Sequence, residues 1–150
     1  MSFLISPAIV LLFGITSLYG QTVDKGSVSS IRGSAAFAEV LLRKTEVEAE
    51  IESVTADYTE TNPKMMDLRF ELGSLNRAVD RLYAVPPSEI GRLSLALGKL
   101  MVKRAALDTD LARLRRTYTE DKPEVKRAKR KVDLFEDAIN DILRTDPGKK

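Results

Sequence analysis

Basic side chains gather near the end of the chain, at a density that could bind a polyanion. The cluster consists of Arg113, Arg115, Arg116, Lys122, Lys126, Arg127, Lys129, Arg130 and Lys131. Lysine and arginine at this density attract phosphate, sulfate and carboxylate groups. The cluster therefore predicts either a solvated helical face or a surface for acidic polysaccharide or anionic lipid headgroups. Nucleic acid is not expected as a partner, because residues 1–20 indicate export from the cytoplasm.

An acidic run lies in the other half of the chain, at Glu46, Glu48, Glu50 and Glu52. Residues 21–84 hold 8 basic and 11 acidic residues, a net charge of −3, whereas residues 85–150 hold 16 and 11, a net charge of +5. The run predicts a solvated face, or a surface that pairs with the basic cluster within the chain or between chains. It has neither the turn glycine nor the loop spacing of an EF-hand, so a metal site is not expected.

The composition removes several kinds of chemistry. The chain has no Cys, His or Trp. Zinc and copper lose their usual ligands without thiolate and imidazole, and the commonest general base is missing. We find no pair of nucleophile and base and no glycine-rich phosphate loop. The sequence therefore predicts a protein that is not an enzyme and that uses no cofactor.

The first twenty residues carry no charged side chain and are mostly apolar. Small Gly20 before Gln21 offers a cleavage site, which predicts a signal peptide over residues 1–20. An uncleaved anchor formed by residues 3–19 and a buried core helix are the alternatives, although Pro7 and Gly14 weaken a helix there. Cleavage would release the body into the periplasm or the extracellular space. Residues 21–33 are polar and lack a sustained period, which predicts a flexible leader.

A motif recurs sixty residues apart, because Tyr58-Thr59-Glu60 with Pro63 returns as Tyr118-Thr119-Glu120 with Pro123. The apolar pattern repeats at the same offset with alternating steps of three and four residues. Before the motif it runs through Phe37, Val40, Val47, Ile51 and Val54, matched by Leu97, Leu100, Leu107, Leu111 and Leu114. After the proline it runs through Met65, Leu68, Leu72, Leu75, Val79 and Leu82, matched by Val125, Ala128, Val132, Phe135, Ile139 and Ile142. This spacing is typical of a coiled-coil seam.

The pattern predicts an all-α fold of two tandem antiparallel helical hairpins. We expect helices over residues 34–58, 63–83, 88–118 and 123–144, with prolines at the first turns of the second and fourth. Hairpin 1 then covers residues 34–84 and hairpin 2 residues 88–144, joined by a linker at 85–87 and followed by a disordered tail at 145–150. The hairpins either close as an elongated four-helix bundle or stay extended and need other chains to cover them. Ser88 is the expected N-cap of the third helix.

Two charged residues interrupt the seam at equivalent places, Lys44 in the first copy and Arg104 in the second. Their aliphatic stems could lie along the seam while their heads reach water or a carboxylate. Alternatively, they set the register or the oligomeric state, as polar seam residues can.

The second motif has a family resemblance. The stretch Leu111-x-x-Leu114-x-x-x-Tyr118-Thr119-Glu120-x-x-Pro123-Glu124-Val125, with the heptads that follow it, resembles the periplasmic coiled-coil segment of polysaccharide chain-length determinant and exopolysaccharide-export proteins. Lys122 stands where that family often has His, and Met65 replaces the valine in the first copy. The family's α/β portion and ATP-binding domain have no counterpart here. The resemblance implies an accessory role or a borrowed module, and it transfers no functional residues.

These features predict a non-enzymatic structural or interaction protein of the cell envelope, accessory to polysaccharide export. It would bind a protein partner or self-associate through its helical seams. A small periplasmic chaperone of the holdase type is the first alternative, because the second hairpin is basic. An envelope stress sensor of helical-hairpin type is the second, although metal sensing would suffer from the lack of His and Cys.

Overall fold

The computed structural model describes residues 25–144, and all regular structure within them is helical, as predicted. The order of elements is α1 (Lys25–Arg32), α2 (Ala35–Val54), α3 (Pro63–Tyr83), the 3₁₀ helix η1 (Pro87–Arg92), α4 (Leu95–Arg115) and α5 (Pro123–Leu143). The expected signal peptide or anchor at 1–20 and the expected tail at 145–150 lie outside the described residues. None of the described helices is long and apolar enough to cross a membrane.

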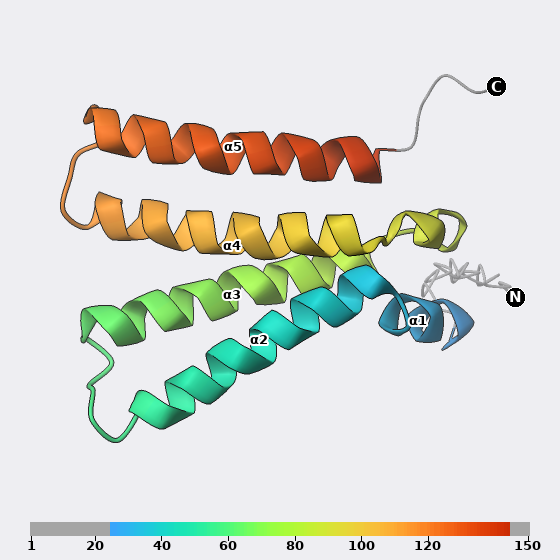
Figure 1. The fold of residues 1–150 in the computed structure, drawn as a ribbon, viewed down its shortest axis with the longest axis horizontal. Helices are drawn as coiled ribbons and strands as arrows, with labels where there is room; N and C mark the ends of the chain where they lie inside the picture. Colours follow the sequence, from blue (N-terminus) through green and yellow to red (C-terminus); the bar gives the residue numbers. More distant parts are fainter. Residues whose placement is uncertain (1–24, 145–150) are drawn as a thin grey trace, which may run out of the picture.

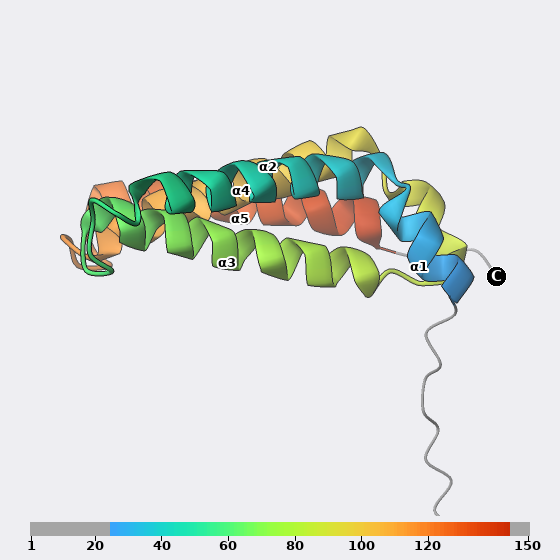
Figure 2. The same ribbon diagram turned by 90° about the horizontal axis from the view of Figure 1, so that it is seen from below.

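The four long helices form two neighbouring pairs (Figure 1). Helix α2 packs along α3, and α4 packs along α5. The turns within the two pairs lie at the same end of the molecule, and α1 and η1 lie at the other end (Figures 1 and 2). Helix α4 also packs against both α2 and α3, so it is the central element, whereas α5 has α4 as its main partner. The structure thus places α4 on the first pair and α5 on the outer side of α4.

The seam residues supply most of the core. In the first copy Val40, Val47, Met65 and Leu75 are almost completely buried, and they belong to one cluster with Leu97 and Met101 of α4. In the second copy Leu111, Val125 and Val132 form a smaller cluster, and Leu107, Leu114 and Ala128 pack against it while still partly exposed. The second copy is less buried because α5 contacts fewer helices.

Helix starts follow local capping chemistry. Ser34 Oγ accepts a hydrogen bond from Phe37 N at 3.2 Å, and Asn62 Oδ1 accepts one from Lys64 N at 2.9 Å. Helices α3 and α5 begin at Pro63 and Pro123, as predicted, because proline fits the first helical position, where its missing N–H has no partner. Helix α2 ends four residues and α4 three residues before the positions expected, which leaves Tyr58 and Tyr118 in the turns and exposed.

The expected start of the third long helix at Ser88 is wrong. Residues 87–92 form η1, and α4 begins after Ser94, whose Oγ accepts from Leu97 N at 3.3 Å. The chain breaks here because Leu93 is buried and its carbonyl accepts a hydrogen bond from Ala36 N at 3.2 Å. That bond satisfies one of the N–H groups that the first turn of α2 leaves without an intrahelical acceptor.

Residues 25–32 form helix α1, where the sequence predicted a leader without regular structure. Ile31 of α1 is buried in the main core, and Arg32 Nε donates to Tyr83 Oη at 3.0 Å. The Tyr83 ring in turn meets Phe37 edge-on, with ring centroids 5.7 Å apart. Helix α1 therefore covers the end of the bundle at which α3 finishes.

Helices α2 and α4 cross closely at Gly98. A Cβ built on Gly98 would lie 2.9 Å from both the Cα and the carbonyl oxygen of Ala36, and 2.8 Å from Glu39 Cβ. Two of these contacts are with the backbone of Ala36, which cannot move aside without shifting α2. A side chain at this position therefore forces the two helices apart.

We expect Gly98→Ala to lower the free energy of unfolding by about 1–3 kcal/mol, because a methyl group there overpacks the crossing. Gly73→Ala is the matched control, since a Cβ on Gly73 of α3 meets only the far end of Arg77 at 3.8 Å. This control should stabilise the protein by about 0.5–1 kcal/mol through better helix propensity. Urea unfolding followed by circular dichroism measures both, and equal effects of the two variants would contradict the close crossing.

Candidate polyanion-binding surface

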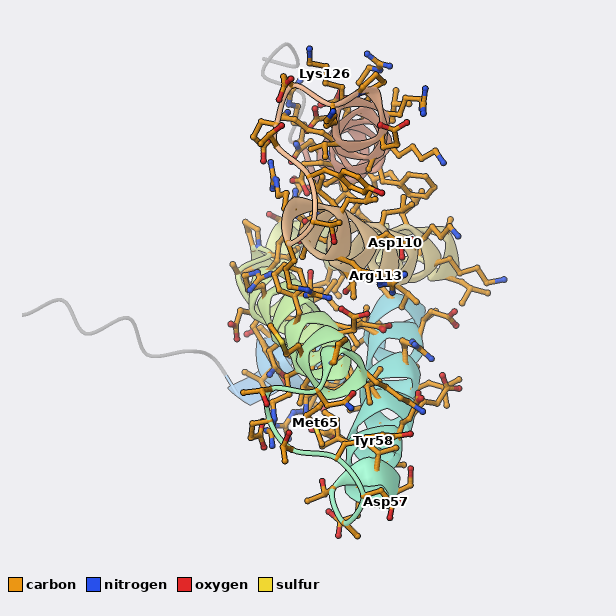
Figure 3. The ribbon with its side chains drawn as sticks, turned by 90° about the vertical axis from the view of Figure 1, so that its left-hand side faces the viewer. Asp57, Tyr58, Met65, Asp110, Arg113 and Lys126 are labelled. Atoms are coloured by element: carbon orange, nitrogen blue, oxygen red, sulfur yellow. The ribbon has the colours of Figure 1, made fainter. Side chains whose placement is uncertain are left out.

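The nine basic residues of the predicted cluster differ in whether they have ion-pair partners in the structure. Lys122, Lys126, Arg130 and Lys131 are exposed and make neither an ion pair nor a side-chain hydrogen bond within residues 25–144. Three of them are spaced by four residues, which places Lys126 and Arg130 on one face of α5 and Lys122, the N-cap, at its start. We call this the basic face of α5. It lies at the top of the molecule in Figure 3, where Lys126 is labelled.

Two further basic residues of α5 have partners only within their own helix. Arg127 pairs with Glu124 at 3.2 Å and Lys129 pairs with Asp133 at 2.6 Å. All four side chains are at least half exposed. Pairs of this kind contribute less than about 1 kcal/mol, so a polyanion could replace the carboxylate at little cost. Arg127 and Lys129 therefore belong with the basic face.

Arg113 and Arg116 instead hold α4 to α3. Arg113 Nε lies 2.7 Å from Asp67 Oδ2, and Arg116 Nη2 pairs with the other oxygen of the same carboxylate. Arg115 makes a two-point contact with Glu120, at 2.6 and 3.1 Å, across the turn between α4 and α5. The structure thus does not bring these three arginines together with the basic face as free cations.

A shallow groove runs beside the basic face, between α4 and α5. Its floor is apolar and its volume is about 380 Å³. The residues that line it are Leu107, Asp110, Arg113, Leu114, Glu124, Arg127, Ala128 and Lys131. A groove with an apolar floor and a charged rim suits a ligand that has both apolar and anionic parts. The sequence places Leu107, Leu114 and Ala128 only in the seam, since nothing in the periodic pattern distinguishes a floor from a core.

The charges of α5 run against its helix dipole. The N-terminal end of a helix carries partial positive charge, which favours acidic side chains in the first turns. Helix α5 has its basic residues there, and Lys122 at the N-cap makes no side-chain capping bond. Among its exposed acidic residues, Glu124 lies in the first turn, whereas Asp133, Asp137 and Asp141 lie in the other half of the helix. The basic residues therefore gain no stabilisation from the dipole, so the dipole does not explain the basic face.

The acidic run on α2 pairs with basic residues of α2 and α3. Glu46 lies 3.1 Å from Arg43, and Glu50 lies 3.2 Å from Lys64. The alternative pairing with Arg113, Arg115 and Arg116 is not found within residues 25–144, because those arginines pair with Asp67, Asp110 and Glu120, and pairing between chains stays a prediction. Within the described part of the chain, no group of three or more acidic residues is arranged to hold a metal ion.

The two charged residues of the seam, Lys44 and Arg104, form ion pairs with carboxylates. This is the first of the two roles expected for them, in which the stem lies along the seam and the head reaches water or a carboxylate. Lys44 pairs with Glu48 one turn along α2. Arg104 lies 3.4 Å from Asp108 in α4 and 3.4 Å from Glu136 in α5. Both side chains are about a quarter exposed, as expected for a stem along the seam and a head at its edge. A role in register stays a prediction.

Asp67 gives this end of the molecule a pH dependence. Burial raises the pKa of its carboxyl, but hydrogen bonds from Arg116 and Arg113 outweigh burial and leave the pKa below its ordinary value. A carboxyl with a lower pKa in the folded state stabilises the fold above its unfolded pKa of about 3.9. That contribution is lost as the pH falls through the folded-state pKa.

We expect Asp67→Asn to lower the free energy of unfolding by about 1–2 kcal/mol at neutral pH, and to make stability fall less between about pH 5 and pH 2 than in the parent. Asp133→Asn is the matched control, because Asp133 is half exposed and pairs within its helix. It should cost less than about 0.5 kcal/mol. Urea titrations across this pH range provide the measurement. If the free energy of unfolding of Asp67→Asn falls with pH as steeply as that of the parent, the role of the arginine pair is contradicted.

Comparisons with protein-family models, with curated proteins and with solved structures find no match to this chain.

Proposed function

We propose that the chain is a non-enzymatic interaction module of the cell envelope, built on two tandem helical hairpins, which binds an acidic polymer through the basic face of α5. One observation carries the proposal. Lys122 at the N-cap, and Lys126 and Arg130 within α5, are exposed, four residues apart and without a side-chain partner among the described residues. They lie in the half of the helix nearer the positive end of its dipole, which does not favour cations. Neutralisation by an acidic ligand would remove this unfavourable arrangement.

An acidic polysaccharide is the ligand class that we favour over anionic lipid. The groove beside the basic face has Leu107, Leu114 and Ala128 as its floor, with arginine and lysine at its rim. Sugar rings present apolar C–H faces next to their acidic substituents, which suits such a groove. The resemblance to polysaccharide-export proteins and the expected export signal support the same setting. The process served would then be polysaccharide export, with this chain as an accessory.

Salt dependence tests the proposal directly. The chain from Gln21 would be titrated against immobilised dextran sulfate and alginate, with neutral dextran as the control. Because binding would release counterions from about four cationic contacts, we expect the dissociation constant to rise roughly tenfold or more for a fourfold increase in salt. Vesicles of anionic and neutral lipid form a second arm. Binding to anionic vesicles but to neither polysaccharide would contradict the polysaccharide assignment.

A holdase chaperone is the second candidate, on a different observation. The outer side of α2 exposes Leu41 and Leu42, with Ala38, Thr45 and Ala49 beside them at helical spacing. Apolar side chains exposed along a helix can bind unfolded segments or a second copy of the chain. The test is suppression of aggregation of an unfolded client at a near-stoichiometric ratio, together with the mass of the chain in solution. A monomer without holdase activity would exclude this candidate.

A further inference from the structure

Three arginines from two helices surround a pocket where α3, α4 and α5 meet. Arg77 and Arg81 come from α3, and Arg104 comes from α4. Glu136 of α5 also lines it. The pocket has a volume of about 230 Å³ and shares no residue with the groove beside the basic face. It therefore does not belong to the surface proposed above.

The pocket carries net positive charge. Besides the three arginines, only two carboxylates, Asp108 and Glu136, take part in its ion pairs. One of the two carboxylates is shared by several donors, because Asp108 Oδ2 lies 3.3 Å from Ser74 Oγ, 3.4 Å from Arg104 Nη1 and 3.7 Å from Arg77 Nη2. Three cations against two anions leave one positive charge without a counterpart in the pocket.

The contacts are also longer than those of a complete network. Charge-assisted N–H···O bonds are about 2.7–2.9 Å long. Arg81 reaches this range with Glu136, at 2.8 Å, but Arg77 and Arg104 reach it with neither carboxylate. Arg104 Nε is buried and donates no hydrogen bond within the described residues, although Glu136 Oε2 lies 3.4 Å away. A buried N–H without an acceptor is unfavourable, and here it shows that the pocket has donors in excess of acceptors.

We infer that this pocket binds the phosphate or carboxylate group of a small anion. A tetrahedral or planar oxyanion supplies several acceptor oxygens to guanidinium groups, which bind such groups through two parallel bonds. It would complete the bonds of Arg77 and Arg104 and balance the excess charge. Met101, Ala78 and Ile139 line the same pocket and provide an apolar surface for the rest of the ligand. The volume is below the range of drug-sized sites, which points to a small ligand such as a sugar phosphate or a sugar acid.

Binding at this place would also fasten α5 to the body. Arg81 of α3 already contacts Glu136 and Asn140 of α5, and α5 otherwise packs mainly on α4, with a smaller contact to η1. An anion held between Arg77 of α3 and Arg104 of α4 would order the side chains against which α5 rests. The same ligand should therefore slow hydrogen exchange in the second half of α5.

Calorimetric titration of the chain from Gln21 with glucose 6-phosphate, glucuronate and inorganic phosphate tests the inference. Glucose and sodium chloride at equal ionic strength are the controls. We expect saturable binding of at least one of the three anions, binding of neither control, and slower exchange of amides in the second half of α5 when the anion is bound. Heats no greater than those of sodium chloride for all three anions would overturn the inference.

Two variants of α3 distinguish anion binding in the pocket from attraction by the overall charge of the protein. Arg77→Gln removes a pocket donor whose side chain is 60% exposed and whose pair with Asp108 is long, so the fold should persist. We expect it to weaken anion binding about tenfold or more, since a hydrogen bond between charged groups is lost. Arg69→Gln makes the same change on the same helix, outside the pocket, and should leave binding within about twofold. Equal losses in both variants would overturn the inference, whether or not α5 binds a polymer.

Discussion

Reversal of three charges on the basic face should abolish binding to an acidic polysaccharide. In the variant Lys126→Glu/Arg127→Glu/Arg130→Glu we expect affinity for dextran sulfate or alginate to fall by at least about a hundredfold. Each cation near an anionic surface contributes about 1 kcal/mol, and reversal replaces attraction with repulsion. Binding assays at several salt concentrations measure the loss, and the salt dependence that remains should be shallow.

The reversed variant should keep its fold. All three positions are exposed. Of the three residues, only Arg127 has an ion-pair partner among residues 25–144, and that partner is Glu124. Glutamate in the first turns of α5 interacts favourably with the helix dipole, by about 0.3–1 kcal/mol per residue where the dipole is felt. We therefore expect a melting temperature equal to that of the parent or slightly higher. A loss of binding with such a melting curve cannot be attributed to unfolding.

A second triple variant controls for net charge. Arg69→Glu/Lys99→Glu/Lys103→Glu changes the total charge by the same amount at exposed positions of α3 and α4. If the basic face of α5 is the binding surface, this control should weaken binding only a few-fold, through the general field of the protein. Equal losses in the two triple variants would mean that total charge governs binding and that α5 has no special part in it.

The features that follow from nearest neighbours along the chain could be predicted. Pro63 and Pro123 determine where α3 and α5 begin, because proline excludes the residue before it from the helix. The three-four spacing identified Val47, Ile51 and Leu75 as core residues, and all three are buried. Both signals depend only on local geometry, so they survive whatever the helices pack against.

The start of α4 could not be predicted, because it depends on a distant contact. Ser88 and Ser94 are equally good capping residues by composition. The choice is made by Leu93, which is buried and gives its carbonyl to Ala36 N across the bundle. In the same way, the buried residues Gly98, Met101, Ala105 and Thr109 form a second face of α4 that the repeat did not reveal. The comparison of the two copies assigned one buried seam to each helix. A central helix such as α4 has more than one buried face, because it packs against several helices.

The candidate sites also depend on contacts between distant parts of the chain, which the sequence pattern does not reveal. The basic cluster was visible in the sequence, but its division into free and paired residues depends on Asp67, which lies on another helix. Arg77 and Arg81 were not identified as site residues at all. Their only local signal is a spacing of four residues on one helix, which is common in solvent-exposed helices. Their meeting with Arg104 depends on how α3 packs against α4, which no local pattern specifies.

Leu97 tests whether the two helical pairs fold as one body. It is completely buried and shares the main core with residues of α2 and α3, such as Val40 and Leu75. We expect Leu97→Ala to lower the free energy of unfolding by about 2–5 kcal/mol, the usual cost of such a cavity. Leu95→Ala is the matched control on the same helix, because Leu95 is 47% exposed, and it should cost less than about 1 kcal/mol.

Which helices Leu97→Ala destabilises is more informative than the size of the destabilisation. If α4 is the central helix, the cavity at Leu97 weakens the packing of α2 and α3 as well as that of α4 and α5. Native-state hydrogen exchange should then speed up in the most protected amides of all four helices by a similar factor, since they open in one cooperative unit. Faster exchange confined to α4 and α5 would mean that the pairs are independent hairpins in solution. The pocket between Arg77 and Arg104 would then lack the rigid frame that holds its arginines together, because those residues belong to different pairs.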